Sequence, residues 1–294
     1  MEHVLKYISK DLEFRVSFVI NSDLMRNLSE TQSFSPLILM GMSRCISSSL
    51  LLASHMDEGC TLSLNFQGEG PWKTLFSEAT FSGGVRAYSS HHDLDLPLVD
   101  GQLDVQGALG EGVLIVARTH PKQAQPRTST VPLTGRGIGS DIAYYLEQSL
   151  QIPAMIVLGT NLDKRGRLMT SGGLLIELLP GASEETISKL EENLKTLPPL
   201  SKLLDKGVPP AEIVQKYVRP FELEKMEHDS RIRYECRCSL ERVERSLTLL
   251  GRKEIEGFVH KDEDLSIQCE FCARRYHVPI NRLQDLLVEM SKIQ

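Results

Sequence analysis

Four of the six cysteines stand in two close pairs near the C-terminus, and this pattern constrains the fold of that region more than any other feature. Cys236 and Cys238 form a C-x-C motif, and Cys269 and Cys272 form a C-x-x-C motif, with residues 239–268 between the pairs. Four thiolates in two pairs are a ligand set for tetrahedral Zn²⁺, with Zn–S bonds of about 2.3 Å. The pattern also permits disulfides or a redox switch, so other features have to decide between these.

The cellular compartment of the protein helps to decide between metal ligands, disulfides and a redox switch. The N-terminal stretch MEHVLKYISKDLEF carries acids and lacks a continuous apolar run, which is not typical of a secretory signal peptide. The longest apolar runs are interrupted by Ser, Gly and Arg44 and fall short of the roughly 20 residues that a membrane span needs. We therefore expect a cytoplasmic protein, in which paired cysteines bind metal or act in redox chemistry more often than they form structural disulfides.

Arginines flank both cysteine pairs and can offset the charge of a four-thiolate metal centre. They are Arg233, Arg237, Arg242, Arg274 and Arg275. The same cluster permits a zinc ribbon that binds nucleic acid or the ribosome, but the formal net charge is −6 and glutamates are interspersed among the arginines. A thiol–disulfide oxidoreductase is another alternative, and it would place C-x-x-C at the start of a helix after a strand. His277 is a further possible ligand, although four sulfurs already complete a tetrahedral site.

Residues 1–179 are predicted to form one α+β domain. Strand-like segments separated by glycine-rich turns follow one another in this region: DLEFRVSFVI, CTLSLNFQGEG, WKTLFSEATF, GGVRAYSS, QLDVQGALGEG, VLIVARTH, AMIVLGTNL and GRLMTSGGLLIELLPG. Residues 35–56 predict a helix with Ser35 as N-cap and Pro36 at its first position. Because this helix is apolar or small on nearly every face, we expect it to be buried.

Three smaller features of the same domain are interpreted structurally. GRGIG precedes a predicted helix and is similar to a phosphate-binding loop, but the Lys-Ser/Thr of such a loop is missing, which favours a flexible turn. Cys45 and Cys60 have apolar neighbours in sequence and are interpreted as small buried hydrophobes. Gly172 and Gly173 predict a bend or a close approach of two backbones.

Residues 180–231 are predicted to be a metastable helical linker. SEETISKLEENLKTL is amphipathic, with Leu190 and Leu194 among its apolar positions, and the short helices LSKLLDKG and PAEIVQKYV follow it. Isolated helices shorter than about 12–15 residues are marginal in water, so we expect these helices to hold by docking and to open readily. Residues 232–294 contain both cysteine pairs and are predicted to be a small zinc-binding redox-switch domain.

Three stretches outside the cysteine region, together with the cysteine motifs, match the pattern of a known family. QGEGPWKTLFSEATFSGGVRAY has a G-x-G-P strand pair, RTSTVPLTGRGIGSDIAYYLEQSLQIPAMIVLG has a D-I-A-x-Y-L-x-Q-S helix, and SGGLLIELLPG is close to G-G-L-L-x-Q-x-L-P. In these respects the chain resembles the 33 kDa redox-regulated heat-shock chaperones, also called 33 kDa chaperonins. Glu177 stands where Gln is common in that family, Ser171 where Ala is frequent and Ala87 where Gly is usual.

The resemblance implies an α+β fold with a three-layer β/α/β core domain around a buried helix, a helical linker and a small C-terminal four-cysteine zinc domain. It also implies one Zn²⁺ per chain in the reduced form, held by Cys236, Cys238, Cys269 and Cys272. Oxidation would form the disulfides Cys236–Cys238 and Cys269–Cys272, release the metal, unfold the zinc domain and free the linker.

The function implied by the resemblance is that of an ATP-independent holdase in the response to oxidative and heat stress. Its partners would be unfolded or partly unfolded client proteins, and it would be a monomer when reduced and a homodimer when oxidised. We expect no enzymatic activity, no membrane association and no nucleic-acid partner.

Overall fold

The chain forms two compact units, Met1–Glu235 and Cys236–Gln294. The computed structural model describes residues 2–227, 230–261 and 264–291. Each unit has its own buried core. The sequence predicts three parts, with the linker as a separate region and a boundary at residue 232. In the structure the segment 180–231 packs within the first unit, and its separate, metastable character stays a prediction.

Two sheets, antiparallel except for one short edge strand, form the framework of the first unit. The five-stranded sheet has the order β10-β1-β2-β9-β8, with β1 (Val4–Ser9), β2 (Phe14–Ile20), β8 (Ala154–Leu162), β9 (Leu168–Leu178) and β10 (Leu223–Met226). The six-stranded sheet has the order β11-β5-β4-β3-β6-β7, with β3 (Thr61–Gly68), β4 (Thr74–Thr80), β5 (Gly84–Ser89), β6 (Gly112–Thr119), β7 (Arg127–Pro132) and β11 (Arg233–Tyr234). The short β11 joins β5 in parallel, and the other pairings are antiparallel.

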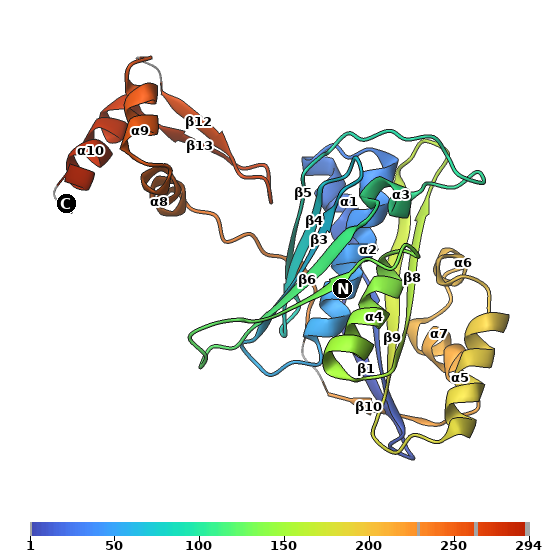
Figure 1. Cartoon of the computed structure of the whole chain (residues 1–294). Helices are drawn as coiled ribbons and strands as arrows, with labels where there is room; N and C mark the ends of the chain where they lie inside the picture. The colour runs from blue at the N-terminus through green and yellow to red at the C-terminus, as the bar shows by residue number, and fades with distance from the viewer. Residues whose placement is uncertain (1, 228–229, 262–263, 292–294) are drawn as a thin grey trace. The chain divides into compact units, whose positions relative to one another are not determined.

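Helix α2 (Pro36–Ala53) lies between the two sheets and contacts strands of both (Figure 1). Its length and composition would allow it to cross a membrane, but most of it is buried inside the first unit, as a core helix is. Ser35 is the N-cap as predicted, yet its hydroxyl donates to Leu94 O (2.8 Å) and fixes a loop, with no bond to the first turn of the helix. The predicted buried helix and the three-layer β/α/β core are confirmed.

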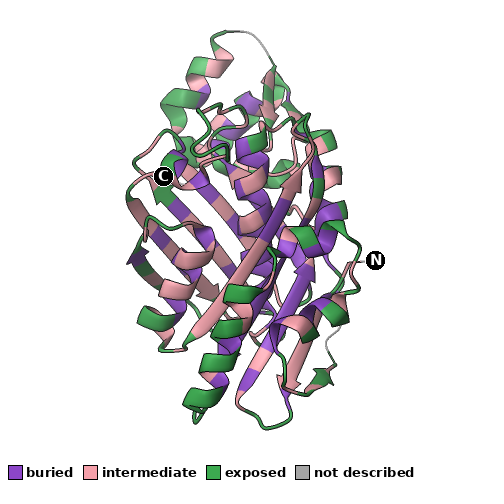
Figure 2. Ribbon diagram, turned by 90° about the vertical axis from the view of Figure 1, so that its right-hand side faces the viewer, coloured by how far each residue is buried: buried purple, intermediate pink, exposed green. Residues whose placement is uncertain are grey.

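The outer face of the five-stranded sheet carries a second hydrophobic core. On β2, Phe14, Val16 and Phe18 point to this face and alternate with Arg15 and Ser17 on the inner one. The segment after β9 covers these side chains with α5 (Glu184–Thr196), α6 (Leu200–Asp205) and α7 (Pro210–Tyr217). Figure 2 shows buried residues concentrated in the strands and exposed residues on the outer helices.

Several elements differ from the sequence-based expectation. The predicted strand over residues 102–112 contains a short helix, α3 (Val105–Leu109), because the side chain of Asp104 caps it by accepting from Gly107 N (2.8 Å). In the first unit, elements that the sequence analysis does not predict are β1, β7, β10, β11 and α1 (Ser22–Thr31), and in the second unit it predicts none of the helices and strands. The predicted helix after GRGIG is α4 (Ile138–Leu150), and Gly135 and Gly137 have positive φ angles of 73° and 106°, as a turn requires.

The glycine pair on β9 behaves as predicted. A Cβ at Gly172 would lie 2.5 Å from Val19 O, and one at Gly173 would lie 2.9 Å from the Leu51 side chain of α2. At Gly172 the neighbour is backbone of β2 and leaves no room for a side chain, whereas at Gly173 it is the end of a side chain from the central helix.

The second unit is small. It contains a hairpin of β12 (Leu265–Gln268) and β13 (Arg275–Val278) and three helices, α8 (Leu240–Leu250), α9 (Arg252–Val259) and α10 (Ile280–Ser291). Among the described residues, its fully buried apolar side chains are Leu247, Ile255, Val278, Leu283 and Leu286. An ion pair between Arg282 and Glu244 (2.8 Å) joins α10 to α8.

Candidate metal centre

The four predicted cysteines are positioned by two local structures of the second unit. Cys236 and Cys238 precede α8, whose N-cap Ser239 accepts from Arg242 N (3.3 Å). Cys269 and Cys272 lie in the turn between β12 and β13. In that turn Cys269 N donates to Arg274 O (2.9 Å), and Ala273 N donates to Cys269 O (2.8 Å). A hydrogen-bonded turn therefore holds one pair, and the start of a helix follows the other.

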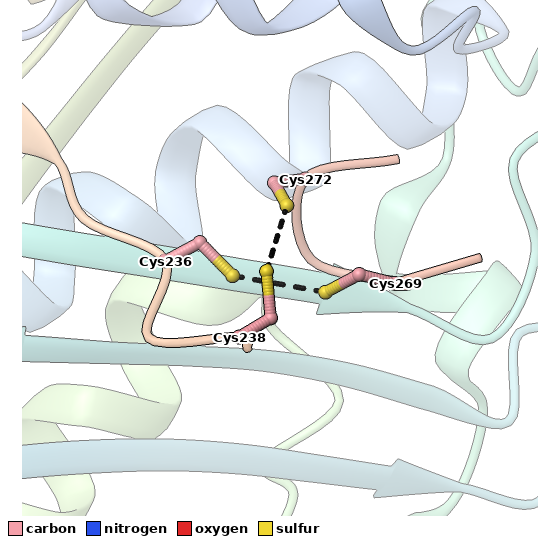
Figure 3. A group of neighbouring side chains, drawn as sticks. All are labelled: Cys236, Cys238, Cys269 and Cys272. Atoms are coloured by element: carbon pink, nitrogen blue, oxygen red, sulfur yellow. Dashed lines mark hydrogen bonds between the residues drawn. The ribbon is translucent and has the colours of Figure 1, made fainter. Parts of the chain in front are cut away.

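The structure brings all four side chains together. Their sulfur atoms lie within 4.8 Å of one another, and Figure 3 shows them pointing toward a common centre. The closest approaches join the two motifs: Cys236 Sγ to Cys269 Sγ is 3.7 Å, and Cys238 Sγ to Cys272 Sγ is 3.4 Å. All four stand as free, partly buried thiols. His277 stands on β13 opposite Ser266, outside this group of four sulfurs.

This geometry fits a tetrahedral metal ion. Sulfur atoms bound at about 2.3 Å to one tetrahedral ion lie about 3.8 Å apart. The two short sulfur–sulfur distances are close to that value before any adjustment of the side chains. Soft thiolate donors of this kind select zinc or an iron–sulfur cluster over magnesium or calcium. The four cysteines can hold a metal ion.

The environment makes the four thiols unequal. Burial raises the pKa of Cys236 and of Cys272 above the ordinary value for a thiol. Burial also acts to raise the pKa of Cys238, but hydrogen bonds from Tyr276 and from the neighbouring thiols outweigh it and lower that pKa to about 7. The hydroxyl of Tyr276 donates to Cys238 Sγ at 3.0 Å. Cys238 therefore becomes a thiolate more readily than Cys236 or Cys272.

Tyr276 is the residue of the site that sequence reasoning missed. It stands on β13, opposite Ile267, and reaches Cys238, which is 38 positions earlier in the chain. A tyrosine in a short strand carries no sign of such a contact. Of the predicted flanking cations, Arg274 interacts with Cys238 and Cys272, whereas Arg233 belongs to the first unit, where it bonds to Ser82 O (2.9 Å).

Comparisons with known proteins cover almost the whole chain. The family described as Hsp33 protein matches residues 2–279. The 33 kDa chaperonin of Desulfotalea psychrophila is 32% identical over 88% of this chain and 88% of its own length. A 33 kDa chaperonin of Synechococcus sp. is 31% identical over 99% of this chain and 91% of its own length. The crystal structure of the 33 kDa chaperonin from Thermotoga maritima superposes with a TM-score of 0.89 at 27% identity and covers 99% of both chains.

Proposed function

Because the chain belongs to the Hsp33 family of 33 kDa chaperonins, we propose that it is a redox-regulated, ATP-independent holdase. It binds unfolding proteins and prevents their aggregation under oxidative and heat stress. The observation that carries this proposal is the group of four free thiols in a small unit with few buried apolar side chains. A unit of this size depends on a bound metal ion or on disulfides for its stability. The oxidation state of the four thiols can therefore control whether the unit is folded.

The metal proposed for the reduced form is one Zn²⁺ per chain, with Cys236, Cys238, Cys269 and Cys272 as its ligands. A structural zinc ion supplies roughly 10–16 kcal/mol of folding free energy in small domains of this kind. Tyr276, by donating to Cys238 Sγ, orients that sulfur and stabilises it as a thiolate.

Oxidation of the thiols is the proposed switch. Formation of Cys236–Cys238 and of Cys269–Cys272 each takes two electrons from a pair of zinc-bound thiolates, and these electrons, with two protons from the solvent, reduce one molecule of hydrogen peroxide to two of water. The sulfurs in disulfides no longer serve as zinc ligands. A disulfide contributes typically about 2–4 kcal/mol, and less when its loop is short. The second unit therefore exchanges a large stabilisation for a small one, and we expect it to unfold.

The proposed client-binding surface is the apolar outer face of the five-stranded sheet, which helices cover in this structure. Helices α5, α6 and α7 cover Phe14, Val16 and Phe18, so the release of these helices exposes contiguous apolar surface on β2 and its neighbours. We propose that unfolded or partly unfolded clients bind to the activated form. We further propose that the reduced chain is a monomer, that the oxidised chain is a homodimer, and that the protein acts in the cytoplasm.

The two alternative functions are less well supported. The comparisons give no support to a zinc ribbon that binds nucleic acid. For a thiol–disulfide oxidoreductase, C-x-x-C would open a helix, whereas here Cys269 and Cys272 lie in the turn of a β-hairpin. The family is one of chaperones, and the position of this motif agrees with a structural switch.

Zinc content and light scattering, measured on the same samples before and after peroxide, test the proposal. The reduced protein should contain one zinc and leave a heat-denatured client free to aggregate. The oxidised protein should have lost zinc and should suppress the scattering. Cys45→Ser serves as the matched control, because this thiol is buried in the first unit beside Ser77 (3.0 Å) and is not a member of the four-cysteine group. Suppression of scattering that is equal with and without peroxide would refute the redox switch.

A further inference from the structure

A second group of metal-ligating side chains lies at the end of the β3–β6 pair, in the first unit. We propose that Asp57, Cys60 and His120 form a second, weaker site for a borderline divalent transition ion such as Zn²⁺ or Co²⁺, with one coordination position left open. The proposal is independent of the four-cysteine centre, all of whose members belong to the second unit.

The sheet register places two of the three donors. In the antiparallel pair of β3 and β6, Thr61 stands opposite Thr119. Cys60 precedes Thr61 and His120 follows Thr119, so the two residues continue the same ladder by one position and come opposite each other. Side chains at opposite positions of antiparallel strands lie about 4.5–5.5 Å apart at Cβ. The thiol and the imidazole are thus brought together by backbone pairing.

A tight turn adds the third donor. Cys60 N donates to Asp57 O (3.1 Å), which folds residues 57–60 back on themselves. Gly59 has a φ of +79°, and a Cβ at that position would lie 2.8 Å from the ring of Pro121. The turn therefore packs directly against the loop that follows His120, at a distance that only glycine allows. The carboxylate of Asp57 is carried to the same end of the sheet.

The three donor atoms have to move only slightly closer together to bind one ion. The three ligand atoms lie within 4.8 Å of one another, whereas donors bound to one tetrahedral ion with Zn–S and Zn–N bonds are about 3.5 Å apart. Asp57 is exposed and can move, while Cys60 is 3% exposed and already faces a hollow of about 270 Å³. One thiolate, one imidazole and one carboxylate form a mixed set that suits zinc or cobalt better than magnesium or calcium.

Three features make this site weaker than a four-thiolate centre. It offers three protein ligands, and Arg118 and Arg127 line the same hollow and repel a cation. His120 accepts a hydrogen bond at Nδ1 from Lys122 N (3.1 Å), which orients the ring. An ion at Nδ1 displaces that bond directly, and an ion at Nε2 moves the ring proton to Nδ1 and breaks the same bond, so binding costs this hydrogen bond as well as the thiol proton of Cys60. We therefore expect the site to fill when free metal is available and to empty on dialysis.

Cobalt absorption tests the site in the full chain. The four-cysteine centre is first loaded with one equivalent of Zn²⁺, and Co²⁺ is then titrated. We expect a thiolate-to-cobalt charge-transfer band that saturates at one further equivalent, is lost in Cys60→Ser, and is at least tenfold weaker in affinity in His120→Gln and Asp57→Asn. Cys45→Ser, the matched buried thiol, should keep the band. A band that survives Cys60→Ser, or no band at millimolar Co²⁺, would overturn the proposal.

The rate of alkylation of Cys60 in the wild-type chain is a second test of the metal site, and it needs no variant at Cys60. Added Zn²⁺ should slow the modification of Cys60 by iodoacetamide at least fivefold, as measured by peptide mass spectrometry. The protection should disappear in His120→Gln. Equal rates with and without added Zn²⁺ would show that Cys60 is not a ligand.

Discussion

At the residue scale, Glu177 is a charged side chain in the interior of the first unit. It is almost fully buried, accepts from Arg15 Nε at 2.6 Å and lies 3.3 Å from His55 Nε2. Lys6 is nearby, and burial lowers the pKa of its amine. The carboxylate therefore neutralises a cationic group of side chains on the inner side of the sheet. A buried charge of this kind is costly to leave uncompensated.

We predict that Glu177→Gln destabilises the first unit. The substitution keeps the shape of the side chain but leaves Arg15 and Lys6 without a counter-charge, which should cost about 2 kcal/mol. For a unit of this size that corresponds to a melting temperature lower by about 5 °C. Glu222→Gln is the control, because Glu222 pairs with Lys10 (2.6 Å) through two well-exposed side chains. Equal melting temperatures of the two variants in thermal unfolding would contradict the prediction.

At the element scale, the stability of helices α5–α7 should control whether the protein binds clients. They are short, but they contribute Leu190, Ile213 and Tyr217 to the core on the outer sheet face. Asn193 donates to Tyr217 O (3.1 Å) and so joins α5 to α7. Their helical state depends on this packing, because segments of this length are marginal alone. Loss of one central contact should release the group.

We predict that Leu190→Asp activates the protein without oxidant. Leu190 is fully buried, and a carboxylate at that position loses the apolar contact and adds an unpaired buried charge, a change of more than about 3 kcal/mol. The variant should suppress client aggregation while zinc is still bound, and hydrogen exchange should rise in residues 184–217 but not in α2. Lys189→Ala, at the exposed neighbouring position, should behave like the wild type. A Leu190→Asp protein that stays inactive until oxidised would show that the helices are not the gate.

At the scale of the whole molecule, the two units have different sources of stability. The first contains two sheets, a central helix and two extended apolar cores. The second has five fully buried apolar side chains among its described residues, with a four-thiol group at one end. Small domains of this kind usually require a metal or disulfides to fold. The state of the thiols should therefore affect one unit much more than the other.

We predict that a zinc chelator, under reducing conditions, unfolds the second unit and leaves the core of the first unit folded. Hydrogen exchange should become fast throughout residues 236–291 and stay slow in α2 and in the central strands β2, β3 and β9, and added zinc should restore protection. The physical reason is the loss of roughly 10–16 kcal/mol of metal-dependent folding free energy from a unit with a small core. Slow exchange in the second unit after complete zinc removal would show that its apolar core is sufficient.

Features that depend on a local pattern of residues can be predicted from the sequence alone. Within each cysteine pair, the spacing of one or two residues is enough to predict a metal site. The apolar composition of α2 on nearly every face is enough to predict that the helix is buried. The three-layer core and the family followed from such stretches and were confirmed. The pairing of the cysteines and the identity of the metal stay predictions, because ligand-like spacing states which side chains can meet but not what they bind.

The tertiary structure decided what depends on residues far apart in the chain. The short strands β10 and β11 exist because they add to the edges of sheets formed by earlier strands, and four or two residues carry too little pattern to predict this. Cys60 is as buried as its sequence predicts, but its position beside His120 follows from the register of β3 and β6. Tyr276 likewise reaches Cys238 only through the folded hairpin. Local sequence determines which elements form, and the free energy of packing and pairing determines which side chains meet.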